Sequence, residues 1–284
     1  MILNPNTPWK VHARQWSSVG QPLRPGLDDI HFVQTAVSDW LENSRQHSPT
    51  VLVMGVTPEL CSLPLDSDSR FIALDKSFSM IENLWRPRPD TQDTAICGDW
   101  RSMPLSRLSV DLALGDGSLS NLRYPDEYET AFRELRRVLR PTGRCLLRCF
   151  MQLDERETIQ NVIADLNAGL IGSFHALKWR LVMALQPSLE EGVAVDAVWQ
   201  LVNERWPDLN RLAQALGCPL EQVSTIRAYQ NVPTRYTFPT FSQYCDFFAA
   251  SRFSVVEIAT HRYELGERCP TFVLEKQADD GSVG

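Results

Sequence analysis

Four segments of the chain carry residue types that suit a ligand containing a nucleoside. Gly55 is followed twenty residues later by Asp75, and then by a Gly-Asp-Trp segment at 98–100 and a Gly-Asp-Gly segment at 115–117. A glycine lets a ligand approach the backbone closely. A carboxylate can accept two hydrogen bonds from a ribose diol, and a carboxylate beside an aromatic ring suits the amino group and face of a purine. Together these groups describe an adenosine site.

Each of these segments follows a short apolar run that predicts a buried β-strand. The expected strands, with helices in most of the gaps between them, are 51–54, 71–74, 94–97, 110–114 and 144–150. Alternating strands and helices are typical of a parallel sheet with helices on both faces. Because ligands bind such sheets at the carboxyl ends of the strands, the four segments are predicted to lie at one edge.

A structural explanation competes with this one. Asp often caps a loop, and for any single Asp here that role is as good an explanation as ligand binding. Suitable groups at four successive strand ends are harder to explain by capping, so we favour the ligand site.

The remaining sequence predicts an organisation in four parts. Residues 1–50 are expected to form an amino-terminal lid and helix, and residues 51–153 with 233–276 to form the α/β core. The strands expected at 253–260 and 271–276 are close enough to form an antiparallel hairpin. No strand is expected between Asp154 and Tyr229, so 154–232 is predicted to be a helical insertion, either a substrate lid or a dimer contact. Residues 277–284 are predicted to be a flexible tail.

Composition excludes several classes of protein. The 284 residues carry a formal net charge of -7, with 43% hydrophobic and 22% charged residues, as in an ordinary globular protein without an affinity for nucleic acid. No run approaches the roughly 18 apolar residues of a membrane span. Seven cysteines without a Cys-x-x-Cys pair, after a polar start broken by prolines, predict reduced thiols in a cytoplasmic protein.

Three segments resemble one enzyme family. "FIALDKSFSMIENL", "AICGDWRSMPL" and "YETAFRELRRVLRPTGRCLLRCF" are similar to the second-strand, third-strand and helix-to-fifth-strand segments of class I S-adenosylmethionine-dependent methyltransferases. The resemblance covers about 51–150 and resumes in the closing hairpin. It implies a Rossmann-like, seven-stranded, mostly parallel sheet with an antiparallel last strand and a helical insertion after the fifth strand. It also implies S-adenosylmethionine as cofactor and S-adenosylhomocysteine as product.

The resemblance assigns roles to individual residues of this sequence. Asp75 would bind the ribose hydroxyls, and the adenine side would be lined by Lys76, Ser77 and Met80. Asp99 and Trp100 would hold the adenine amino group and ring. The methionine half would be framed by Gly55, Thr57, Gly115, Asp116 and Gly117.

The stretch "VLVMGVTPEL" departs from the family pattern. The family has an acidic residue and three alternating glycines at the positions of Val53, Gly55, Thr57 and Glu59, and only Gly55 is kept. Local signals favour a helix start here, because Thr57 suits an N-cap and Pro58 the first helical position. Glu59 would then either lie near a cationic ligand or point to solvent. The departure also leaves open a relative that binds the cofactor without catalysis.

Candidates for a general base are Asp116, Tyr124 and His175, each of which has an alternative role as a cap, core or surface residue. Tyr124 and His175 are also expected to contact the substrate, as are Trp16 and Arg180. Trp16 shares one face of a short predicted helix with Trp9 and His12, as a substrate contact or a docking surface. Arg180, in the insertion, would pair with an acidic substrate or with another side chain.

The leading hypothesis is methyl transfer from S-adenosylmethionine to an oxygen or nitrogen atom of a small molecule. A nicotinamide dehydrogenase is disfavoured because no Gly-x-Gly-x-x-Gly follows the first strand. The alternative is a non-catalytic relative that acts through a protein partner. A homodimer is left open.

Overall fold

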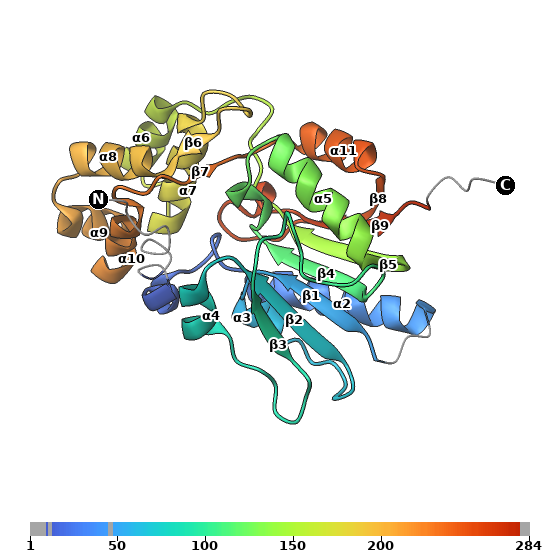
Figure 1. Ribbon diagram of the computed structural model, residues 1–284. Helices are drawn as coiled ribbons and strands as arrows, with labels where there is room; N and C mark the ends of the chain where they lie inside the picture. Colours follow the sequence, from blue (N-terminus) through green and yellow to red (C-terminus); the bar gives the residue numbers. More distant parts are fainter. Residues whose placement is uncertain (1–9, 11–12, 45–47, 279–284) are drawn as a thin grey trace.

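The computed structural model describes residues 10, 13–44 and 48–278. A seven-stranded sheet with strand order β3-β2-β1-β4-β5-β9-β8 forms the centre (Figure 1). Neighbours among β1 to β5 pair in parallel, whereas β9 runs antiparallel to both β5 and β8. The predicted fold class is therefore confirmed. The strands are β1 (Thr50–Met54), β2 (Arg70–Asp75), β3 (Thr94–Cys97), β4 (Val110–Asp116), β5 (Leu139–Arg148), β8 (Phe253–Ala259) and β9 (Thr271–Lys276).

The alternation of side chains along the strands builds two apolar layers, one on each face of the sheet. Val51 and Val53 of β1 pack towards α2 (Leu27–Ser44), together with Val33 and Val37 of that helix. The intervening side chains, such as Leu52, pack on the opposite face, where α5 (Asp126–Val138) and α11 (Phe241–Ala250) cover the sheet. Successive side chains of a strand point to opposite faces, so a continuous apolar run is what a strand covered on both faces requires.

Two short helices follow the first two strands and begin at the edge of the sheet predicted to bind the ligand. They are α3 (Pro58–Cys61) and α4 (Phe78–Leu84). The amino-terminal segment, here residues 13–26, contains the short 3-10 helix η1 (Trp16–Ser18). The 3-10 helix η2 (Leu119–Asn121) follows β4, and the 3-10 helix η4 (Gly266–Arg268) lies between β8 and β9.

Between β5 and β8 lies a helical segment beside the sheet (Figure 1). Its central helix, α7, is buried on nearly all sides and packs against the others, which is typical of a core helix. The elements are α6 (Ile159–Asn167), α7 (Phe174–Leu185), α8 (Val195–Arg205), α9 (Leu209–Leu216), α10 (Leu220–Ser224) and the 3-10 helix η3 (Thr225–Tyr229).

One expectation for this segment was wrong. No strand was expected between Asp154 and Tyr229, but β6 (Val193–Ala194) pairs antiparallel with β7 (Arg235–Tyr236). A strand of two residues is too short for side-chain alternation to show in the sequence. None of the described helices is both long and apolar enough to cross a membrane.

A buried ionic cluster joins the sheet to the amino-terminal segment. Arg148, at the end of β5, lies between two buried carboxylates, with Nη1 2.5 Å from Asp116 and Nε 3.3 Å from Asp29. Its Nη2 donates to the carbonyl oxygen of Pro22 at 2.5 Å and to the hydroxyl of Tyr263 at 3.0 Å. One guanidinium thus holds together the end of β4, the start of α2, the amino-terminal segment and the loop between β8 and β9.

Replacing this guanidinium is predicted to destabilise the fold strongly. Arg148→Leu leaves Asp29 and Asp116 buried without their counterion, so the free energy of unfolding should fall by about 3–5 kcal/mol in urea denaturation. The control is Arg123→Leu, which removes an exposed guanidinium that pairs with Glu127 four residues later and should cost no more than about 0.5 kcal/mol. Equal losses in the two variants would contradict the role given to Arg148.

Candidate functional site

A cavity of about 470 Å³ opens at the carboxyl ends of the parallel strands. The ends of β1, β2 and β4 and the loop after β3 supply one part of its wall. Trp16 and Leu23 of the amino-terminal segment supply another, and Trp179 and Tyr229 of the helical segment supply a third. The sheet edge predicted to bind the ligand is therefore covered by the amino-terminal segment and by the helical segment.

The corner between β1 and β2 is built for close approach of a ligand. Gly55 has φ +119°, an angle at which a residue with a side chain would be strained. Its N–H donates to the carbonyl oxygen of Leu74 at 2.9 Å. A Cβ added at Gly55 would lie 3.8 Å from Oδ2 of Asp75. Oδ1 of Asp75 accepts from the backbone N–H of Ser77 at 2.7 Å, whereas no described residue donates a hydrogen bond to Oδ2. One carboxylate oxygen is thus held and the other is open to a ligand.

Burial raises the pKa of Asp75 to about 6, although the hydrogen bond from Ser77 opposes the shift. Ser77 also caps α4, because its hydroxyl accepts from the N–H of Met80 at 3.3 Å. Met80 is buried against the cavity, whereas the side chain of Lys76 is 76% exposed and its Nζ lies 3.5 Å from Asp99. All four of these predicted residues line the cavity.

Asp99 lines the cavity but is already engaged by its own chain. The Arg101 side chain grips both carboxylate oxygens, with Nε 2.8 Å from Oδ1 and Nη2 2.5 Å from Oδ2. The backbone N–H of Arg101 also donates to Oδ1 at 2.9 Å. These hydrogen bonds, with the charges of Arg101 and Lys76, hold the pKa of Asp99 well below its usual range. An adenine amino group would have to share this carboxylate with Arg101.

Trp100 is fixed beside the carboxyl end of β2, because its indole N–H donates to the carbonyl oxygen of Leu74 at 2.6 Å. Arg101 and Glu127, which form an ion pair, also line the cavity but were not among the predicted residues. Arg101 directly follows Asp99 and Trp100 in the sequence, so its position already indicated that it would lie near the cavity. Glu127 lies 26 residues further along the chain, on α5, and only the fold brings it here.

The turn after β1 differs from expectation in two details. Thr57 lines the cavity and precedes Pro58 at the helix start, but its side chain makes no capping hydrogen bond. Glu59 neither points to solvent nor lines the cavity, because it accepts a hydrogen bond from Nε of Arg24 at 2.6 Å. Arg24 also stacks over the ring of Trp16, with its Cζ 5.2 Å from the ring centroid. The acidic residue at a family glycine position therefore secures the amino-terminal segment.

The end of β4 is tightly packed. Asp116 is buried against Arg148, and burial raises its pKa to about 6 although the charge of Arg148 opposes the shift. Gly117 has φ +60°, and a Cβ there would lie only 2.3 Å from the ring of Phe150. Asp116 and Gly117 line the cavity, whereas Gly115 lies behind it, against the side chain of Leu147 on β5.

The four predicted substrate contacts have different positions. Trp16 lines the cavity, but Tyr124, His175 and Arg180 do not. Tyr124 packs edge-on against Tyr128. His175 is buried and its Nε2 lies 2.9 Å from the carbonyl oxygen of Ser18. Arg180 forms ion pairs with two carboxylates of the helical segment, Glu157 and Asp165. Trp9 and His12, predicted to share a face with Trp16, lie outside the described residues.

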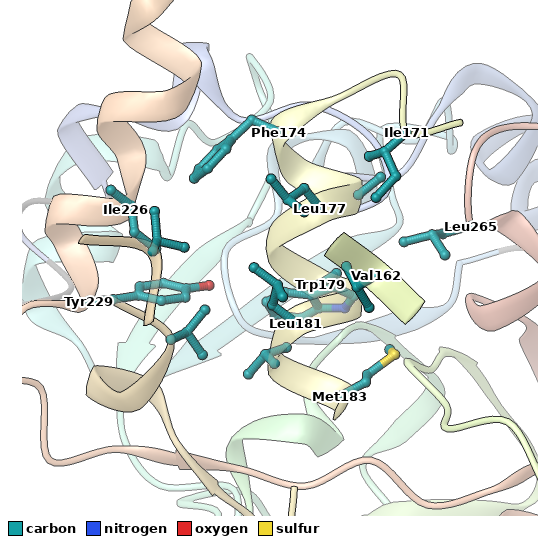
Figure 2. Close-up of a cluster of buried hydrophobic side chains, with 14 of the residues drawn as sticks. Val162, Ile171, Phe174, Leu177, Trp179, Leu181, Met183, Ile226, Tyr229 and Leu265 are labelled. Carbon is teal, nitrogen blue, oxygen red and sulfur yellow. The ribbon is translucent and has the colours of Figure 1, made fainter. Parts of the chain in front are cut away.

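Aromatic side chains that the sequence pattern did not indicate form the far wall of the cavity. They are Phe150, two residues after the carboxyl end of β5, Trp179 and Tyr229 of the helical segment, and Tyr236 of β7. Figure 2 shows Trp179 and Tyr229 within the apolar cluster around α7, with Tyr229 on the opposite side of that helix from Val162. Among the described residues, no group of three or more His, Cys, Asp or Glu side chains could hold a metal ion.

Comparison with known proteins agrees with this geometry. Residues 53–147 match the sequence profile of the methyltransferase domain family, a stretch that runs from β1 to β5. No curated protein sequence matches the chain.

Among solved structures, a candidate zinc-dependent alcohol dehydrogenase from Rhodobacter sphaeroides has a TM-score of 0.57 at 13% identity, covering 98% of this chain and 100% of the other. A complex of a methyltransferase activator with a candidate methyltransferase from Haloferax volcanii gives 0.50 at 13% identity, with 96% of each chain covered. A protein of Pyrococcus horikoshii gives 0.52 at 13% identity, covering 93% of this chain and 99% of the other. At these identities the similarity shows the fold alone.

The family match covers the strand ends that build the cavity, and the strand order places those ends at one edge of the sheet. Residues 53–147 of the chain therefore match a methyltransferase domain, and they lie within a sheet of the Rossmann-like kind.

Proposed function

We propose that the chain catalyses methyl transfer from S-adenosylmethionine to an oxygen or nitrogen atom of a small molecule, in the cytoplasm. The observation that carries this proposal is the extent of the cavity. It runs from Asp75, at the end of β2, past Gly117 to Trp179 of the helical segment. A cavity of about 470 Å³ falls within the range of small-molecule sites, and it extends beyond the strand ends that suit the cofactor.

The residues at the strand ends fit the cofactor. We assign the open Oδ2 of Asp75 to the ribose hydroxyls, and Gly55, whose positive φ favours glycine, leaves its side of the cavity without a Cβ. Met80 and the fixed ring of Trp100 are assigned to the adenine. The amino group of the adenine would share the carboxylate of Asp99 with Arg101. The methionine end falls to Thr57, Asp116 and Gly117, while Gly115 supports that turn from behind.

When bound, the cofactor supplies an electrophilic methyl group: the acceptor's lone pair forms the new bond to carbon as the carbon–sulfur pair returns to sulfur, leaving S-adenosylhomocysteine. The protein contributes orientation and exclusion of water. Asp116 lines the cavity but is paired with Arg148, and Tyr124 and His175 lie outside the lining. We infer that the acceptor reacts through its own lone pair and releases any proton to water.

One observation favours a second candidate, a cofactor-binding relative that acts through a protein partner or a second copy of the chain. Of the glycine positions in the family pattern only Gly55 is kept, and Glu59 is used to pair with Arg24. The methionine end could then hold the cofactor without transferring its methyl group.

Loss of the Asp75 carboxylate is predicted to weaken cofactor binding. Asp75→Ala removes the acceptor of two ribose hydrogen bonds, so the affinity for S-adenosylhomocysteine should fall at least about tenfold in calorimetry. Asp68→Ala is the matched control, because Asp68 is an exposed acid in the loop before β2. Unchanged affinity in Asp75→Ala, with the fold retained, would exclude this residue from the site.

Cofactor affinity is predicted to depend on pH through the same group. With a pKa of about 6 in the free protein, Asp75 is ionised above that pH and accepts the ribose hydrogen bonds; acidification neutralises it and weakens binding. Affinity for S-adenosylhomocysteine should be about tenfold lower at pH 5 than at pH 8. Asp75→Asn should flatten the profile. Because Asp116 titrates in the same range, a full wild-type slope in Asp75→Asn would assign the effect to Asp116 instead.

Turnover is predicted to separate the enzyme from the non-catalytic relative. The protein is incubated with methyl-labelled S-adenosylmethionine and a small-molecule extract, and the products are followed by mass spectrometry. An enzyme should form S-adenosylhomocysteine and one labelled small molecule in equal amounts, and both should form more slowly with Asp75→Ala when the cofactor is below saturation. Tight cofactor binding without any labelled product would favour the non-catalytic relative.

A further inference from the structure

The far wall of the cavity is a continuous set of aromatic rings. The ring centroid of Trp179 lies 4.9 Å from that of Phe150 and 5.6 Å from that of Tyr236, and Tyr236 lies 6.3 Å from Tyr229. Trp16 and Leu23 line the same cavity from the amino-terminal segment. We call this wall of Phe150, Trp179, Tyr229 and Tyr236 the aromatic wall.

The aromatic wall adjoins the part of the cavity assigned to the methionine end of the cofactor. Phe150 connects the two, because its ring lies against the backbone of Gly117, where a Cβ would come within 2.3 Å. Gly117 directly follows β4, and Met54 at the end of β1 is tied to the same turn through the hydroxyl of Ser118, 2.7 Å from its carbonyl oxygen. A molecule against the aromatic wall would therefore lie next to the reacting end of the cofactor.

The aromatic wall carries no ionised group at neutral pH. The charged side chains among the described lining residues all belong to the strand-end part of the cavity: Asp75, Lys76, Asp99, Arg101, Asp116 and Glu127. Burial raises the pKa of Tyr236 to about 12 and that of Tyr229 well above its usual value, so both hydroxyls stay neutral. An anionic ligand would find no cation among these four side chains.

A cationic ligand is disfavoured by a buried amine behind the aromatic wall. Nζ of Lys178 lies 4.8 Å from the ring centroid of Tyr229 and 5.7 Å from that of Phe174. The amine therefore already occupies the cation–π position on Tyr229, and in its charged form it would repel a second cation. Burial lowers the pKa of Lys178 to about 7, so only a fraction of the amines carries that charge at neutral pH, and Lys178 is not among the lining residues that an anion could contact.

Two buried polar atoms of the lining residues are left without a hydrogen-bond partner in the described part of the chain. They are the indole Nε1 of Trp179, a donor, and the amide Oδ1 of Asn121, an acceptor. The amide nitrogen of Asn121 is held by the carbonyl oxygen of Gly117 at 3.3 Å, so the side chain is oriented. Buried polar groups rarely stay unpaired, and a ring that carries both an acceptor and a donor offers each of them a partner.

We propose that the aromatic wall binds the methyl acceptor, and that this acceptor is a flat, uncharged aromatic or heteroaromatic molecule. The proposal rests on the methyl transfer proposed above and names its substrate class. Flat rings suit a wall of rings because offset and edge-on contacts between aromatic groups are favourable beyond the area they bury.

A panel of four ring compounds tests shape and charge separately. Binding is measured by calorimetry on the full chain saturated with S-adenosylhomocysteine. The probes are 2-naphthol, which is flat and neutral; decahydro-2-naphthol, neutral but not flat; 2-naphthoate, flat and anionic; and phenyltrimethylammonium, flat and cationic. 2-Naphthol should bind at least about tenfold more tightly than each of the others. Equal or tighter binding of any other probe would overturn the proposal.

Variants place the bound probe in the cavity. Tyr236→Leu should weaken 2-naphthol binding about tenfold, and Thr234→Asp, which adds a charge to a partly exposed lining position, should weaken it at least as much. Phe241→Leu, at an exposed aromatic on α11 outside the cavity, should have no effect. Unchanged 2-naphthol binding in both cavity variants would overturn the site. Unchanged affinity for S-adenosylhomocysteine reports that each variant is folded.

The same measurements distinguish failure of this inference from failure of the proposed function. If wild type binds no S-adenosylhomocysteine, the proposed methyl transfer fails, whatever the probes do. If it binds S-adenosylhomocysteine but prefers a charged or saturated ring, methyl transfer stands and the substrate class is wrong.

Discussion

The placement of one buried positive charge controls how the parts of the site meet. Arg148 leaves the end of β5 and lies between Asp116 and Asp29, two carboxylates from distant parts of the chain. Burial of three ionised groups is costly unless each is paired, so their relative positions are narrowly fixed. Asp116 belongs to the turn that borders the cavity, and Asp29 begins the helix that follows the amino-terminal segment. The sheet edge and its cover are thereby held by the same guanidinium.

The altered turn after β1 belongs to the same arrangement. Two of the three glycine positions of the family pattern are occupied by Thr57 and Glu59, and Glu59 pairs with Arg24, which in turn stacks on Trp16. Glycines at these two positions would make the turn flexible and let a ligand approach the backbone closely. Here Glu59 instead fixes the turn to the amino-terminal segment. Gly55 alone keeps the positive φ that brings the backbone close to Asp75. The departure from the pattern is therefore local, and it has a structural use.

The sheet and the strand-end groups could be predicted because they depend on local pattern. Apolar runs of four to seven residues indicate strands, and the residue after each run must lie at the edge of the sheet, which is why Asp75 and Asp99 were found. The engagement of Asp99 by Arg101 could not be predicted, since it depends on rotamers. Trp179 and Tyr229 were missed because an aromatic residue in an apolar helical segment has the same pattern whether it faces a cavity or a core, and Tyr236 was missed because its strand has only two residues.

The hydrogen bond between His175 and the carbonyl oxygen of Ser18 joins the two coverings of the cavity to each other. The amino-terminal segment and α7 are therefore not independent flaps, and the roof they form must open as one unit or break this contact. Trp16 and Trp179, which belong to these two coverings, both line the cavity, so one hydrogen bond joins two of its walls.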